Sequence, residues 1–223
     1  MTIAVPHNKA EGDVDRLVQH AFFPGDGTGK VFVDVGAARP DYLSISAHFR
    51  SAGWRVLSIE PNPSFCDMHR KKGHEIYQYA CGHRDEDDVD FCIVDSHGAM
   101  YENGQVTYES FSALAIKDAY ASLKENLDVR KIKVNLRRLD TILNKHAPDV
   151  RHIDILSIDV EGWELEVISG LNVAAYRPSV MIVENLFDDI KYRTHLETLS
   201  YSLWQRIYPN DVYLRNGFSE VSR

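Results

Sequence analysis

Short apolar runs alternate with segments of helical spacing along most of the chain. This alternation predicts a doubly wound α/β fold, in which a mostly parallel sheet is covered by helices on both faces to give three layers. The expected strands are the apolar runs 31–35, 54–59, 75–79, 90–94, 153–159 and 180–184. The expected helices are the segments 13–23, 43–52, 63–72, 139–146 and 163–170.

The ends of the chain and one central region depart from this pattern. Residues 1–29 indicate an N-terminal helix followed by a glycine-rich turn. The segments after residue 195 predict a helix and then an antiparallel hairpin around Pro209 and Asn210, so the sheet is expected to end in an antiparallel strand. Periodicity is poor over 95–126, which we expect to be an insertion covering the active site, with a further helix over 113–123. All 223 residues are expected to form a single domain.

Composition and charge limit the location, the binding partners and the cysteine chemistry that we expect of the protein. No stretch approaches the roughly 18 apolar residues of a membrane span, and no secretory signal begins the sequence, so a cytoplasmic protein is expected. The net charge of −8 argues against a nucleic-acid partner. One basic cluster, 130–133 with Arg137 and Arg138, is interpreted as the solvated side of a connection into a helix. The three cysteines contain no CxxC pair, which disfavours a disulfide framework and a thiolate zinc site.

The first two expected strands end in residues suited to a nucleoside. Asp34 closes the first strand and is followed by Gly36 and Ala37, where the missing side chain of the glycine allows a ligand to approach the backbone. Glu60 ends the second strand, 24 residues beyond Gly36. An acidic residue at this place commonly accepts hydrogen bonds from ribose hydroxyls. Together these strand ends suggest a cofactor that contains adenosine.

The glycine pattern separates two kinds of cofactor. A nicotinamide dinucleotide site predicts G-x-G-x-x-G, whereas the segment from Gly36 to Asp41 reads GAARPD and lacks two of the three glycines. Those glycines bring a pyrophosphate against a helix N-terminus, so their absence favours a cofactor without one. An NAD-binding oxidoreductase and a non-catalytic cofactor-binding domain of the same fold stay open as alternatives.

Acidic residues gather at the ends of the later strands. Asp159 and Glu161 follow the 153–159 strand, and Glu184 with Asn185 ends the next one. One hypothesis is a Mg²⁺ site built from Asp159, Glu184 and Asn185, because oxygen ligands at adjacent strand ends suit that ion. The other is a general base that removes a hydroxyl proton, for which Asp159, Glu161 and His195 are the candidates.

Several motifs, taken in order, resemble the FkbM-type methyltransferase family. They are VFVDVGAA, VLSIEPNP, LDTIL, IDILSIDVEGWELEVISGL and MIVEN, and the resemblance runs from about Val31 to about Phe218. It implies a class I methyltransferase (Rossmann-like) fold and S-adenosylmethionine as methyl donor. It also implies an acceptor hydroxyl on a small molecule or glycan, such as a sugar, a glycolipid or a polyketide-like compound.

The same resemblance implies roles for individual positions. Asp34 and Gly36 would flank the methionine part of the cofactor. Independently of the resemblance, Ala37 in the same turn and Asp159 at its strand end are also expected to lie beside the cofactor. Glu60, in the segment with Pro61 and Asn62, would bind the ribose hydroxyls. Ala80 and Cys81 would lie near the adenine. The family commonly carries an Asn and a further Gly after DVGA, whereas this chain has Ala38, Arg39 and Pro40, which makes Arg39 a candidate partner for the cofactor carboxylate.

Overall fold

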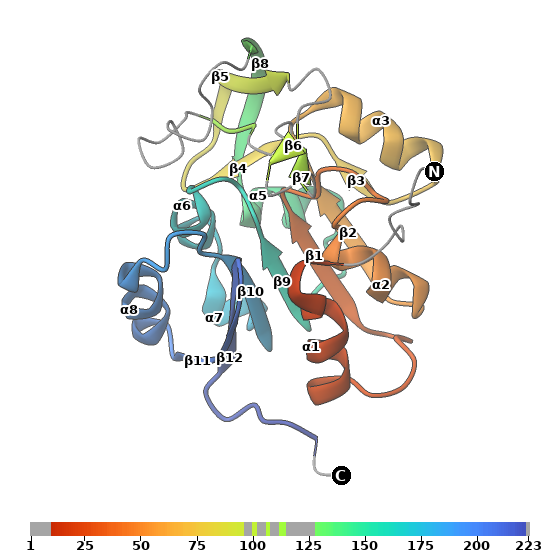
Figure 1. The fold of residues 1–223 in the computed structure, drawn as a ribbon, viewed down its shortest axis with the longest axis vertical. Helices are drawn as coiled ribbons and strands as arrows, with labels where there is room; N and C mark the ends of the chain where they lie inside the picture. The colour runs from red at the N-terminus through yellow and green to blue at the C-terminus, as the bar shows by residue number, and fades with distance from the viewer. Residues whose placement is uncertain (1–9, 96–99, 102–105, 108–111, 115–127, 222–223) are drawn as a thin grey trace.

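The computed structural model describes residues 10–95, 100–101, 106–107, 112–114 and 128–221. Its centre is a seven-stranded sheet with the strand order β11-β12-β10-β9-β1-β2-β3 (Figure 1). The strands from β10 to β3 are parallel, whereas β12 is antiparallel to both β10 and β11. These strands are β1 (Val31–Val35), β2 (Arg55–Ile59), β3 (Ile76–Tyr77), β9 (Ile155–Ile158), β10 (Val180–Glu184), β11 (Tyr201–Ile207) and β12 (Asn210–Arg215).

Consecutive residues of the central strands enter different hydrophobic cores, as expected of strands that are buried on both faces. On β1, Phe32 belongs to one core, whereas Val33 and Val35 belong to the other. The Phe32 core contains α1 (Val14–Phe22) and α2 (Ile45–Ser51), and the opposite core contains α5 (Leu139–His146), α6 (Glu164–Ser169), α7 (Val173–Tyr176) and α8 (Ile190–Thr198). Figure 1 shows α1 and α2 on one side of the sheet and α6 to α8 on the other, which gives the three expected layers.

Two further helical segments approach the carboxyl edge of the sheet. The short helix η1 (Glu11–Asp13) leads directly into α1. The helix α3 (Pro63–Lys71) begins after Asn62, whose side chain accepts a hydrogen bond from the backbone N–H of Ser64. This N-cap and the proline at the first helical position fix the start of α3 immediately after the β2 turn.

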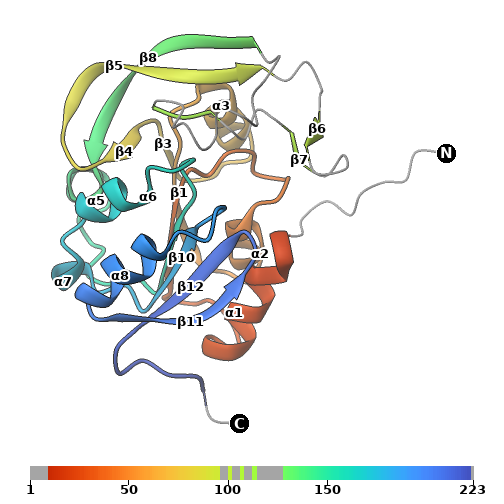
Figure 2. The same cartoon turned by 60° about the vertical axis from the view of Figure 1, so that its left-hand side comes forward.

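A second sheet, not expected from the sequence, lies beside the first. Its strand order is β4-β8-β5, with β4 (Ala80–Gly82) parallel to β8 (Asp128–Arg138) and β5 (Glu86–Asp95) antiparallel to it. Figure 2 shows the long β5 and β8 strands together at the top of the molecule. The basic residues that the sequence placed in a connection therefore belong to a strand, where Lys131 and Lys133 pair with Asp90 across the ladder.

The expected helices and strands of the alternating pattern are otherwise confirmed, with ends that differ by a few residues. In the 95–126 region, β6 (Met100–Tyr101) pairs with β7 (Val106–Thr107), and Ala113 forms a bridge with Cys92. Most of the helix expected over 113–123 lies outside the described residues. Among the residues that the structure describes, no helix is long and apolar enough to cross a membrane.

Candidate active site

A pocket opens at the carboxyl ends of β1, β2, β9 and β10, where a doubly wound sheet is expected to bind its ligand. Most of the predicted cofactor and acid positions line it, together with residues from the N-terminal segment and the second sheet. From the predicted set, the lining contains Asp34, Gly36, Ala37, Glu60, Pro61, Ala80, Cys81, Asp159, Glu161 and Glu184. Ser112, Ala113 and Leu114 also line the pocket, so this segment of the expected cover lies against it.

The turn after β1 brings two strand ends into backbone contact. Gly36 has a φ of +83°, and the N–H groups of Gly36 and Ala37 both donate to the carbonyl oxygen of Ile59, at 2.9 and 3.2 Å. A Cβ atom at Gly36 would lie 1.7 Å from the carbonyl oxygen of Asp159. Only glycine therefore fits at this position in the floor of the pocket.

Glu60 is held by the backbone on both sides. One of its carboxylate oxygens accepts a hydrogen bond from the N–H of Ala38 at 2.9 Å, and the other accepts one from the N–H of Asn62 at 2.7 Å. The side chain is buried, and this burial raises the pKa of Glu60 to about 7, although both hydrogen bonds oppose the rise. The carboxylate is thus fixed in orientation at the wall of the pocket.

Asp34 lies on the α2 face of β1 among buried polar groups. Burial raises the pKa of Asp34, while a hydrogen bond with Ser46 and the positive charge of Arg50 act against this rise. The guanidinium of Arg50 also donates to the hydroxyls of Ser46 and Ser58, at 3.4 and 3.1 Å. These contacts attach the end of β1 to α2.

Three carboxylates meet at the ends of β9 and β10. Each of Asp159, Glu161 and Glu184 offers an oxygen, and the three oxygens lie within 4.8 Å of one another. Asp159 is open to the pocket although protein atoms crowd it on its other sides, whereas Glu161 and Glu184 are buried. Burial, reinforced by the neighbouring carboxylates, raises the pKa values of Asp159 and Glu184 well above the ordinary range. The group therefore retains a proton where isolated carboxyl groups would have lost theirs.

Glu164 supports the loop that carries this group. It is fully buried, and one of its oxygens accepts hydrogen bonds from the N–H groups of Val160 and Gly162, at 3.1 and 2.9 Å. The other oxygen accepts from the hydroxyl of Tyr192 at 2.6 Å. Within the loop Glu161 adopts a φ of +59°, a conformation that a non-glycine residue holds only when its surroundings fix it.

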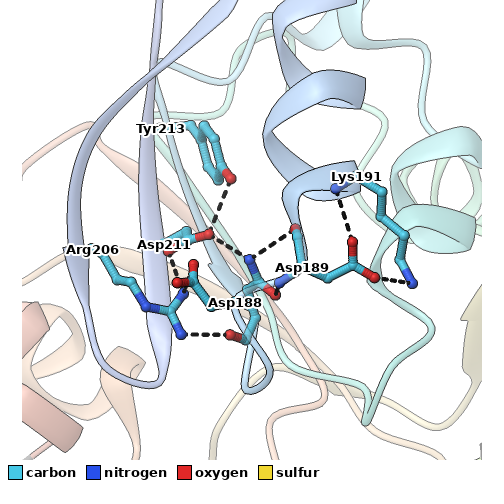
Figure 3. Close-up of polar contacts among 7 residues, drawn as sticks. Asp188, Asp189, Lys191, Arg206, Asp211 and Tyr213 are labelled. Carbon is cyan, nitrogen blue, oxygen red and sulfur yellow. Dashed lines mark hydrogen bonds and ion pairs between the residues drawn. The ribbon is translucent and has the colours of Figure 1, made fainter. Parts of the chain in front are cut away.

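Asn185 lies in a different polar cluster, at the junction of β10 with the C-terminal hairpin. Figure 3 shows its partners Asp189 and Asp211 together with Arg206. Its amide nitrogen donates to a carboxylate oxygen of Asp211 at 2.8 Å, and its amide oxygen accepts from the N–H of Asp189 at 2.8 Å. Arg206 donates to the other Asp211 oxygen at 2.8 Å and lies 3.4 Å from Asp188. The predicted metal set is therefore not brought together as such, because Glu161 joins Asp159 and Glu184 where Asn185 was expected.

Three other predicted residues do not line the pocket. Asn62 caps α3, and the guanidinium of Arg39 lies 3.9 Å from Asp41. His195 lies in the last turn of α8. Conversely, Glu11, Tyr42, Trp163, Leu186 and Tyr208 line the pocket although the sequence did not single them out. Trp163 lies within the motif IDILSIDVEGWELEVISGL, whereas the other four come from turns and element ends far apart in the chain that no local motif distinguishes.

The fold and the pocket together define a doubly wound α/β protein with an acidic ligand site at the carboxyl edge of its sheet. Residues 34–206 match the Methyltransferase FkbM domain, which includes both the Gly36 turn and the acidic group. The chain therefore belongs to the FkbM methyltransferase family, and its sheet has the arrangement expected of a class I methyltransferase fold.

Two relatives accompany this match. Methyltransferase sdnD from Sordaria araneosa is 32% identical over 87 residues, which cover 34% of this chain and 34% of the relative. A crystal structure of methyltransferase FkbM from Methylobacillus flagellatus KT superposes with a TM-score of 0.49 at 12% identity, covering 83% of this chain and 43% of that one. The chain thus spans well under two thirds of the length of either relative.

Proposed function

We propose that this protein transfers a methyl group from S-adenosylmethionine to a hydroxyl oxygen of a small molecule or glycan. The single observation that carries the proposal is that the Gly36 turn, the fixed Glu60 carboxylate and the acidic group line one pocket. The first two suit a nucleoside cofactor, and the third suits an acceptor that must lose a proton. The acceptor classes that we propose are sugars, glycolipids and polyketide-like alcohols.

The described residues fit such a cofactor. Gly36 lets the backbone of Asp159 pack against the β1 turn, and this brings Asp34, Gly36 and Asp159 together in the pocket wall that would receive the amino-acid part of the cofactor. The Glu60 oxygens keep lone pairs for ribose hydroxyls, since each accepts one backbone hydrogen bond. Ala80 and Cys81 provide a buried apolar wall for the adenine. When bound, the cofactor supplies an electrophilic methyl group on a sulfonium sulfur.

We further propose that Asp159 accepts the hydroxyl proton. It is the member of the acidic group that is open to the pocket, and its raised pKa makes it a stronger base than an ordinary carboxylate. Glu184 hydrogen-bonds to Asp159, and the close approach of the three carboxyl groups lets them share a retained proton. Trp163 before α6, Leu186 after β10 and Tyr208 in the hairpin line the same pocket and would limit the access of water to the group.

A divalent cation is the alternative means of activation. The spacing of the Asp159, Glu161 and Glu184 oxygens favours it, since three carboxylate oxygens within 4.8 Å of one another suit oxygen coordination of Mg²⁺. A bound cation would lower the pKa of a coordinated hydroxyl, so that no side-chain base would be needed. Chelation distinguishes the two proposals, because only the second predicts loss of turnover in EDTA.

Ligand-induced thermal stabilisation tests the proposed cofactor. We expect S-adenosylhomocysteine to raise the melting temperature by several degrees and NAD to leave it unchanged, because a ligand that binds only the folded state stabilises it. The measurement is a melting curve at saturating concentrations of each compound. Stabilisation by NAD alone would overturn the proposal in favour of an oxidoreductase.

The pKa of Glu60 predicts how cofactor affinity depends on pH. Ribose hydroxyls donate to the ionised carboxylate, so below pH about 7 binding must also remove the Glu60 proton. We expect the Kd for S-adenosylhomocysteine to fall several-fold between pH 6 and pH 8, measured by isothermal titration calorimetry. A Glu60→Gln variant should bind more weakly with a flatter profile, and an equally steep profile in that variant would assign the pH dependence to another group.

A further inference from the structure

The turn that departs from the family pattern contains a strained residue. Ala38 has a φ of +41°, which lies in the left-handed region. For a residue with a side chain this region costs about 1–2 kcal/mol relative to ordinary conformations. Such a residue persists when its surroundings determine its conformation, so the contacts that hold Ala38 decide the shape of this part of the pocket.

Hydrogen bonds hold Ala38 at both of its backbone polar groups. Its N–H donates to Glu60, and its carbonyl oxygen lies 3.2 Å from Nε2 of His69 on α3. His69 is completely buried and lies outside the pocket lining. Its Nδ1 is 3.1 Å from Nδ1 of His74, in the segment between α3 and β3.

The chemistry of these contacts defines the tautomer of His69. A carbonyl oxygen only accepts, so Nε2 of His69 carries the hydrogen and donates it to Ala38. In the neutral ring Nδ1 is then an acceptor, and Nδ1 of His74 must donate to it. Burial lowers the pKa of both histidines to about 4, and the nearby charge of Arg50 adds to this, so both rings stay neutral at physiological pH.

We propose that His69 is a positioning residue for the cofactor site, whose tautomer His74 sets and whose donated hydrogen bond holds the Ala38 turn. Through Ala38, His69 orients the same backbone that donates to Glu60, although it is buried behind the pocket wall. This inference rests on the proposed cofactor, because its effect is expressed as cofactor affinity. It also explains how the turn keeps its shape without the further glycine that is common in the family.

Paired amide substitutions test the proposal. In a His69→Gln variant the amide nitrogen occupies the place of Nε2 and still donates to Ala38, whereas in His69→Asn it lies near Nδ1 and cannot reach. We expect His69→Asn to weaken the binding of S-adenosylhomocysteine about tenfold, which corresponds to the loss of one well-placed hydrogen bond. His69→Gln should remain within about threefold of the wild type, as measured by isothermal titration calorimetry.

A control separates positioning from general destabilisation. Tyr201 is equally buried and donates to the carbonyl oxygen of Pro178 at 2.6 Å, but it lies outside the pocket lining. Tyr201→Phe should lower the melting temperature and leave the Kd unchanged. A His74→Phe variant, which keeps His69 but removes its donor, should weaken binding and provides the test if His69→Asn does not fold.

The outcomes distinguish this inference from the proposed function. If the wild-type protein binds no S-adenosylhomocysteine, the proposed function fails. If the wild type binds and His69→Asn and His74→Phe bind equally well, the function stands and the positioning role is wrong. Equal weakening in His69→Gln and His69→Asn would also overturn it, because ring packing and not the donated hydrogen bond would then matter.

Discussion

Replacing Gly36 with alanine is expected to abolish binding of S-adenosylhomocysteine and to lower the free energy of unfolding by about 2–5 kcal/mol. The left-handed conformation accounts for about 1–2 kcal/mol of this loss, and a forced steric contact for about 1–3 kcal/mol. The contact is severe because the new Cβ would lie 1.7 Å from the carbonyl oxygen of Asp159, which is backbone. Urea unfolding monitored by circular dichroism gives the free energy, and calorimetry gives the affinity.

Gly53 provides a matched control for the Gly36 substitution. Its φ of +85° almost equals that of Gly36, yet no heavy atom lies within 4 Å of the Cβ position. The Gly53→Ala substitution should therefore lower the free energy of unfolding by only about 1–2 kcal/mol, the cost of the left-handed conformation. The variant should bind S-adenosylhomocysteine as tightly as the wild type. Equal stability and equal affinity of the two variants would contradict the close approach of the β1 turn to the β9 end.

The central strands were predictable because burial on both faces leaves continuous apolar runs in the sequence. The strand β8 was not predictable, although it is eleven residues long. Its first five residues are exposed or half-buried, and most of them are not apolar, so the sequence contains no apolar run there. It is stabilised by its ladder with β5 and by ion pairs across that ladder. Such pairing depends on a partner about 40 residues away, which periodicity within a window does not detect.

The acidic group shows which features of the site could not be predicted from the sequence. Glu184 and Asn185 are neighbours in sequence, but consecutive residues of an extended segment point in opposite directions. Glu184 therefore lines the pocket, while Asn185 hydrogen-bonds to Asp211. Glu161 belongs to the group and adopts a left-handed conformation in the loop after β9, and no sequence pattern marks a glutamate for that conformation.

The N-terminal segment illustrates a contribution that comes only from tertiary structure. Glu11 lies in η1 and lines the pocket with the acidic group, at least 140 residues away in sequence from Asp159. Its charge is among those that raise the pKa values of Asp159 and Glu184. The sequence identified the strand ends that form the pocket floor, whereas the residues above that floor depend on how distant segments pack.

An Asp159→Asn variant is expected to lose methyl transfer by a factor of about 10²–10⁴, the usual contribution of a general base. The amide has nearly the same shape but accepts no proton, so affinity for S-adenosylhomocysteine should change much less than turnover. The assay measures release of S-adenosylhomocysteine with an acceptor found by screening sugars, glycolipids and polyketide-like alcohols. Asp154→Asn is the matched control, since this carboxylate lies before the amino end of β9 and accepts from the N–H of Val31 at 2.8 Å.

Treatment with a chelator distinguishes two reasons for the loss of turnover in the Asp159→Asn variant, namely removal of a general base and removal of a cation ligand. If Asp159 is the base, wild-type turnover should persist after exhaustive treatment with EDTA, and the variant should stay inactive when Mg²⁺ is added. Loss of wild-type activity in EDTA, restored by Mg²⁺ but not by Ca²⁺, would instead assign Asp159, Glu161 and Glu184 to a cation, because Mg²⁺ requires the tighter octahedral geometry. Normal turnover in Asp159→Asn would exclude both roles, since each requires the carboxylate that faces the pocket.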